Sequence, residues 1–318
     1  MGIQWRPMRP KDVRECVGIV AAHPVLGPRY GSTIHELNSV WLGLLGREAF
    51  RAVVFEEVIG AKQKILGAGV SAFVRDEFFD ELKTSPRRWM GPAITERIVR
   101  DQSPLLSDKE TREANADGGL NLLVWEGIVR PEDFLRVEVN VAAVSAFVEQ
   151  HRGFLLTEVL SQCVNIEQLL SSVHGGAMFL DDDGQYVNSL PCPVEEALAK
   201  PHFIGMTRQL ALSRAGSWIG SIFLYQPARF GFRPSEQRLL LTALRGGTDP
   251  ELAHELGVSL SAVKKSWALI YERVSPHLQG FSSCHELIGG ATERGKEKKQ
   301  RLLCYLRDHP EELRPASV

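Results

Sequence analysis

The alternation of hydrophobic and polar positions separates the chain into two regions. Up to about residue 228, segments with the two-residue period of strands alternate with segments of helical period, whereas only helical periods follow. Segments rich in β-branched and aromatic residues predict strands at Phe50–Val58, Ile65–Val74 and Leu120–Val129. The last segment is apolar on both faces, as a central strand is. The pattern predicts an α+β domain with a mainly antiparallel sheet, followed by an all-α domain.

The rest of the first region is assigned from the spacing of its apolar residues. Helical spacing predicts helices at Val13–Ala22, Thr33–Leu45, Val137–Glu149 and, as one long helix or a helix pair, Phe154–Val173. Two more strands are predicted on either side of a glycine-containing turn, at Phe203–Ser213 and Trp218–Tyr225. The segment Ser103–Gly119 is rich in charged and small residues, which predicts a mobile loop.

The second region contains three short predicted helices. The first begins at Pro234 and ends at a pair of glycines. Asp249 is the predicted N-cap of the second helix, which extends from about Pro250 to Leu256. The third helix, Leu260–Val274, follows a serine cap and carries an apolar stripe at helical spacing. A final helix is predicted from about Glu293 to Arg307.

Two helices joined by a tight glycine-containing turn form a helix-turn-helix, whose second helix enters the major groove of DNA. The candidate DNA-binding residues on the third helix and its cap are Ser259, Ser261, Ala262, Lys264, Lys265 and Ala268. Small side chains allow close approach to base edges, and lysines reach phosphate or guanine. The alternative is an ordinary three-helix packing unit with a solvated lysine face.

This run resembles the LuxR-type (GerE-like) helix-turn-helix family of bacterial transcription regulators. The similarity covers about 45 residues and is carried in its last helix by Ser259, Ala262, Val263, Lys264, Ser266, Ile270, Arg273 and Val274. Ala262 stands where the family has threonine, and Ser266 where it has histidine. The resemblance implies binding of double-stranded operator DNA, as a dimer.

The N-terminal region loosely resembles the GNAT acetyltransferases. The similarity is carried by Met8-Arg9-Pro10-Lys11-Asp12, by Gly67 in the third strand and by the order strand, helix, helix, hairpin. That family holds the pyrophosphate of acetyl-CoA with a glycine-rich loop at a helix N-terminus. The corresponding segment, Arg130–Arg136, contains no glycine and two carboxylates, which would repel a pyrophosphate. The resemblance therefore implies the architecture without the chemistry.

Composition and charge agree with a two-domain regulator. The net charge of −2 divides into +3 from Arg229 to the C-terminus and −5 before it, the sign expected if only the C-terminal part meets phosphate. The five cysteines are dispersed, which is typical of a reducing cytoplasm, and no apolar run is long enough to cross a membrane. We expect a cytoplasmic protein.

The sequence offers no pattern of catalytic or metal-binding residues. The histidines lack metal spacing, and there is no phosphate-binding loop or nucleophile elbow. Three carboxylates on predicted strands, Glu56, Glu57 and Glu126, could face a cleft, but a solvated strand face explains such residues more simply. We therefore predict no enzyme, no cofactor, no metal site and no catalytic residue.

The full prediction is a transcription regulator in three parts. An α/β sensor or ligand-binding domain, degenerate GNAT-like in architecture, covers residues 1–228, the helix-turn-helix domain 229–280 and a helical tail 281–318. The first domain would receive a small-molecule or protein signal. Two alternatives remain: a GNAT-like acetyltransferase fused to a DNA-binding module, and an anti-activator that binds another protein.

Overall fold

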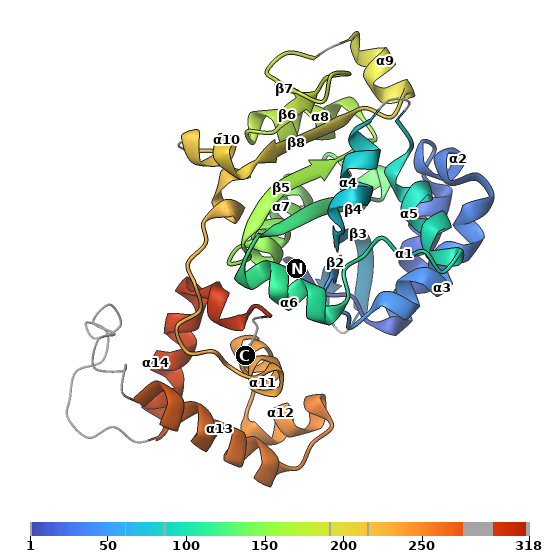
Figure 1. Cartoon of the computed structure of the whole chain (residues 1–318). Coiled ribbons are helices and arrows are strands. Elements are labelled where there is room, and N and C mark those ends of the chain that lie inside the picture. Colours follow the sequence, from blue (N-terminus) through green and yellow to red (C-terminus); the bar gives the residue numbers. More distant parts are fainter. Residues whose placement is uncertain are drawn as a thin grey trace. The chain divides into compact units, whose positions relative to one another are not determined.

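The computed structural model describes residues 2–60, 62–84, 87–190, 192–214, 216–275 and 295–315. The chain divides into two compact units, unit 1 (Met1–Leu224) and unit 2 (Tyr225–Val318), which are coloured from blue to red in Figure 1. The predicted boundary at residue 280 lies outside the described residues. Within the described ranges, no helix has both the length and the apolarity to cross a bilayer.

Unit 1 is built on a mixed sheet of eight strands in the order β1-β2-β3-β4-β5-β8-β6-β7. The strands are β1 (Gly2–Pro7), β2 (Phe50–Ile59), β3 (Lys62–Val74), β4 (Leu120–Val129), β5 (Leu156–Ser161), β6 (Met178–Leu180), β7 (Tyr186–Val187) and β8 (Phe203–Thr207). Strands β4 and β5 are parallel, and the other paired neighbours are antiparallel. The α+β class is confirmed, and β4 lies inside the sheet as predicted, but the parallel pair was not predicted.

Helices cover the sheet on both faces. They are α1 (Pro10–Ala22), α2 (Leu26–Tyr30), α3 (Ile34–Leu44), α4 (Asp76–Lys83), α5 (Met90–Val99), α6 (Asp108–Ala116), α7 (Val137–His151), α8 (Ile166–His174), α9 (Val194–Ala199) and α10 (Arg208–Ser213). The main hydrophobic core includes α1, α3 and α5 together with Val70 and Trp125 of the sheet. Helix α7 contacts β1, β2 and β3 instead, and its Ala146 packs with Val53 and Phe55 in a separate cluster.

Three predictions for unit 1 are wrong. The predicted helix or helix pair at Phe154–Val173 is strand β5 followed by helix α8, because a short apolar run fits either structure until tertiary packing decides. The predicted second strand of the terminal hairpin contains a 3₁₀ turn at Gly220–Phe223. The predicted first strand, Phe203–Ser213, is strand β8 up to Thr207 and helix α10 from Arg208 onward. The predicted loop contains α6, whose capping box of Ser107 and Glu110 is a sequence signal that was missed.

A buried ionic network joins the first strand to the first helix. Arg6 on β1 donates two hydrogen bonds to the Asp12 carboxylate, of 2.6 and 3.1 Å, and its Nε donates to Glu56 at 2.9 Å. The Glu56 side chain is fully buried, and Gln4 donates to its other oxygen at 2.9 Å. Burial raises the pKa of Asp12, but hydrogen bonds from Arg6 and from the Arg9 backbone outweigh it and hold the pKa below its ordinary value.

Unit 2 is helical and has a core of its own. It contains α11 (Pro234–Leu244), α12 (Asp249–Leu256), α13 (Leu260–Val274), α14 (Gly295–Asp308) and a short 3₁₀ helix at Pro310–Leu313. Phe232, Trp267, Ile270 and Leu302 pack in one cluster, so α14 shares the core of α11 and α13.

The helix caps of unit 2 agree with the sequence prediction, except that one N-cap lies one residue earlier than predicted. Thr248, and not Asp249, is the N-cap of α12, in a capping box with Glu251. Gly257 ends this helix in the left-handed conformation, with φ of +65°. The Ser259 hydroxyl accepts the backbone N–H of Ala262 at 3.2 Å, which confirms the predicted start of α13.

Candidate functional site

Strands β4 and β5 part half-way along β4. Their pairing begins at Leu120 and Leu156 and ends at Val124 and Ser161, and beyond Val124 no described strand pairs with β4 on that side. At the same level the register between β3 and β4 shifts, so that Ser71 faces two residues of β4. An open edge of a central strand is thereby formed at the carboxyl end of a parallel pair, where α/β proteins commonly bind ligands.

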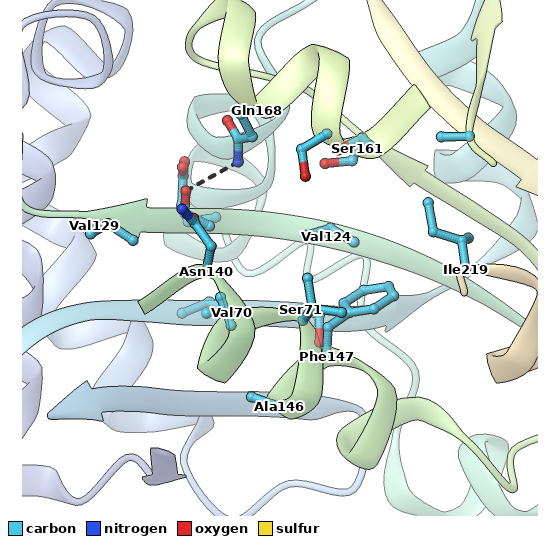
Figure 2. A pocket seen from close by; sticks show the side chains of 18 of the residues that line it. Val70, Ser71, Val124, Val129, Asn140, Ala146, Phe147, Ser161, Gln168 and Ile219 are labelled. Carbon is cyan, nitrogen blue, oxygen red and sulfur yellow. Dashed lines mark hydrogen bonds between the residues drawn. The ribbon is translucent and has the colours of Figure 1, made fainter. Parts of the chain in front are cut away.

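A cavity of about 370 Å³ occupies this opening. It is lined by residues of β2 to β5, α7 and α8, and Figure 2 shows Val70, Ser71, Val124, Phe147, Ser161 and Gln168 around it. The walls are mostly apolar, with a few polar groups, as in typical small-molecule sites. The side-chain amide of Gln168 donates to the backbone oxygen of Gly127 at 3.3 Å, on the open edge of β4.

Glu126, on the open part of β4, is one of the residues that line the cavity. Glu126 is only 6 % exposed, and the Tyr30 hydroxyl donates to its Oε1 at 2.6 Å. The Trp125 indole N–H in turn donates to the Tyr30 hydroxyl at 3.0 Å. Burial raises the pKa of Glu126 to about 7, although the Tyr30 hydrogen bond and the charge of Arg29 lower it. A carboxyl group in this state can accept or release a proton near neutral pH.

Glu126 also borders a second, much smaller pocket, of about 10 Å³, together with residues of α2 and α5. There the Arg29 guanidinium lies 3.7 Å from the centre of the Trp89 ring and donates to the Cys163 backbone oxygen at 3.3 Å. Gln162 accepts the Met90 backbone N–H at 2.7 Å, which ties the start of α5 to the end of β5. Glu126 therefore lines both the cavity and the small pocket beside α2 and α5.

The interpretation of the strand carboxylates as a solvated face is wrong for two of them. Glu56 is fully buried in the network of Arg6, and Glu126 is buried beside the cavity. Glu57 is half-buried and paired with Arg136 at 2.7 Å. The signal for Glu126 was its place in the most apolar strand, LNLLVWEGIV, where no solvated face exists.

The segment Arg130–Arg136 lies between β4 and α7, where the sequence placed a degenerate phosphate loop. Its two arginines already form ion pairs: Arg136 pairs with both Glu57 and Asp133, and Arg130 pairs with Glu15. Asp133 also accepts from Lys64 at 3.3 Å. The residues present do not fit a pyrophosphate, because a second anion would have to displace these carboxylates. Among the described residues, no three His, Cys, Asp or Glu side chains are placed to hold a metal ion.

The candidate DNA-binding residues lie at the N-terminal half of α13. Ser261, Lys264, Lys265 and Ala268 are exposed, and Ala262 is half-buried. Ser259 is exposed and caps the helix. The structure therefore places all six on α13 or its cap in unit 2, whereas every residue that lines the cavity belongs to unit 1. Their contact with DNA stays a prediction.

No protein-family model matches the chain, and no curated protein matches it. The solved structures that resemble it include AAC(6')-Ib in complex with ribostamycin and coenzyme A, at 12% identity over 68% of this chain and 99% of that chain, with a TM-score of 0.35. They also include a Drosophila melanogaster polyamine N-acetyltransferase, which forms N-acetylagmatine, at 14% identity over 64% and 99%, with a TM-score of 0.31.

These neighbours correct two predictions. One is named an N-acetyltransferase and the other was solved with coenzyme A, whereas the main prediction was a DNA-binding regulator and its alternative a GNAT-like acetyltransferase. The prediction that the chain is not an enzyme is corrected with it. In the sequence, the loop Arg130–Arg136 is the one feature that counts against this alternative, and nothing in the sequence indicates the cavity that Glu126 lines.

Replacing Gly91 by Ala is expected to disturb Glu126 directly. A Cβ on Gly91 would lie 2.2 Å from the Tyr30 hydroxyl and 2.6 Å from Glu126 Oε1, so this hydrogen-bonded pair would have to move. We expect a loss of about 1–3 kcal/mol in the free energy of unfolding, measured by urea denaturation. Gly18→Ala in α1 is the matched control, because nothing lies within 4 Å of its Cβ. The control should gain about 0.5–1 kcal/mol, and equal losses in both variants would contradict the account.

Proposed function

We propose that unit 1 catalyses acyl transfer from a thioester to an amine. One observation carries the proposal: the cavity opened by the parting of β4 and β5 is lined by Glu126, a buried residue whose carboxyl pKa is raised to about 7 by burial. A group that must take a proton from an amine at neutral pH needs a pKa in this range. The apolar walls keep water away from a thioester, which water would otherwise hydrolyse.

The donor would bind along the open edge of β4. An extended chain that carries amide groups can add to such an edge, because the strand offers unpaired N–H and C=O groups. A pantetheine arm, with two amides and a thiol at its end, has this chemistry. The Gln168 side-chain amide donates a hydrogen bond to Gly127 on this edge. It would therefore mark the limit of the donor site on the side of α8.

In the proposed step, the acceptor amine attacks the carbonyl carbon of the thioester. A C–N bond forms, the C–S bond breaks, and the thiol leaves. Glu126 accepts the proton that the amine nitrogen loses, and this proton returns to the leaving thiolate. Tyr30 holds Oε1 in place through its hydrogen bond of 2.6 Å, which leaves Oε2 for the proton.

The loop Arg130–Arg136 decides which donors to test. Because its carboxylates and paired arginines do not fit a pyrophosphate, a pantetheine thioester should bind at least as well as the corresponding coenzyme A thioester. Binding of acetyl-pantetheine and acetyl-CoA to the full chain is measured by isothermal titration calorimetry. Transfer to a panel of primary amines is followed by the release of thiol.

The expected result is binding of acetyl-pantetheine and release of thiol that depends on the amine. Gly69→Leu, which would place a large side chain against Val53 and Phe55 at the cavity wall, should abolish both. Gly43→Leu in α3, where nothing lies within 4 Å, is the control for the insertion. Absence of binding and of thiol release for every donor and amine would refute the proposal.

A further inference from the structure

An arginine that makes no hydrogen bond or ion pair with any described side chain lines the cavity. Arg51 on β2 is half-buried, its Nε atom is buried, and no described residue forms a hydrogen bond or ion pair with its guanidinium. The Phe154 ring centre lies 5.0 Å from its Cζ atom. Burial lowers the pKa of Arg51 to about 10, although the negative charges of Glu48 and Asp108 raise it. Glu48 is not available to it, since this carboxylate binds Arg112 at both oxygens.

The position of Arg51 relates it to the proposed reaction. Arg51 is the Cα partner of Ser71, and Ser71 stands at the register shift where β4 and β5 part. Nε2 of the buried His151 lies 2.7 Å from the Ser71 hydroxyl, while its Nδ1 bonds to the Phe147 backbone oxygen at 2.7 Å. One wall of the cavity therefore carries polar groups among apolar surroundings.

The charges around the cavity favour a singly charged anion. Among the described lining residues, Arg51 is the one arginine or lysine, and Glu126 and Glu167 are the acidic residues. A guanidinium whose Nε atom is buried without a hydrogen-bond partner costs free energy, which a bound carboxylate offsets through two parallel hydrogen bonds. A doubly charged phosphate would meet one cation and two carboxylates, so a carboxylate fits better.

We propose that the acyl group of the donor ends in a carboxylate, which the Arg51 guanidinium binds. The substrate class would then be thioesters of dicarboxylic acids, with the thioester near Glu126 and the free carboxylate near Arg51 and Ser71. Val53, Val124 and Phe147 line the space for the methylene chain between the two ends. This inference rests on the proposed acyl transfer and adds the identity of the acyl group.

Calorimetry on the full chain compares glutaryl-pantetheine with pentanoyl-pantetheine, which have the same chain length and differ in the terminal carboxylate. We expect the glutaryl compound to bind about ten- to a hundredfold more tightly, the range for a charge-assisted hydrogen-bonded pair. Arg51→Met should remove this preference, and Arg51→Lys should retain part of it. Arg97→Met is the control, because Arg97 is paired with Glu81 and lines neither pocket.

Stability separates this role from a structural one. Because Arg51 has no hydrogen-bond or ion-pair partner within the described ranges, Arg51→Met should unfold at the same or a higher temperature than the wild type without ligand. Only the glutaryl compound should stabilise the wild type more than the variant. Equal binding of both thioesters to the wild type, or an unchanged preference in Arg51→Met, would overturn the proposal. Transfer of the pentanoyl group in that case would leave the proposed function standing. A glutaryl preference without any transfer would retain the Arg51 site and refute acyl transfer.

Discussion

Glu126→Gln is expected to lower the rate of acyl transfer by about 100- to 10,000-fold, the usual contribution of a general base. The substitution removes the ionisable group and keeps its shape. The Gln oxygen can still accept the Tyr30 hydroxyl, so the pair of side chains at the edge of β4 is retained. The measurement is the single-turnover rate of thiol release with donor and amine at saturation.

Two comparisons make this expectation specific. The affinity for acetyl-pantetheine should stay within a few-fold of the wild type, because the donor binds along β4 and not through the carboxylate. Glu113→Gln, on the exposed face of α6 and paired with Lys109, is the matched control and should keep the wild-type rate. A Glu126→Gln protein that binds the donor and transfers its acyl group at the rate of the control would exclude Glu126 as the base.

Arg6→Met is expected to lower the free energy of unfolding by about 3–5 kcal/mol. The variant leaves the fully buried Glu56 carboxylate and the 5 % exposed Asp12 side chain without their cation. Removing one partner of a buried ionic network costs more than the network contributes, because the remaining charges stay out of water.

Urea denaturation at several pH values measures this effect. The lowered pKa of Asp12 stabilises the wild type above the unfolded-state pKa of the group, and this stability is lost as the pH falls through the folded-state pKa. The variant should lack this acid dependence. Arg97→Met, which breaks the more exposed pair with Glu81, should cost less than about 1 kcal/mol. Equal losses in the two variants would show that the Arg6 network is not buried in solution.

The sequence predicts most of the elements whose signals are local. β4 is recognised by its continuous apolar run, and α13 by its serine cap and apolar stripe, because these patterns need no information from the rest of the chain. β5 is not recognised, since LTEVLS fits a helix as well as a strand until β4 and β8 flank it. The parallel pair, and with it the cavity, depends on that one assignment.

The candidate site around Glu126 and Arg51 could not be predicted from the sequence, for a related reason. Nothing near Glu126 or Arg51 in the chain marks them, because the residues that define their state come from distant segments. Tyr30 of α2 binds Glu126, and Ser71 of β3 lies opposite Arg51. Burial gives both side chains their altered pKa values, and burial follows from the fold. The helix-turn-helix pattern, by contrast, is local and easy to recognise in the sequence. The functional prediction therefore rested on unit 2.

The most direct test of the account is the dependence of the transfer rate on pH, measured with an aromatic amine that stays neutral throughout the range. Burial raises the pKa of Glu126 to about 7, and the ionised form is the one that accepts a proton. The rate at saturation should therefore rise about tenfold for each pH unit below 7 and level off above it, and this rise should vanish in Glu126→Gln. A wild-type rate that does not change between pH 5 and pH 8, two units below and one above the expected pKa, would contradict the central role of Glu126.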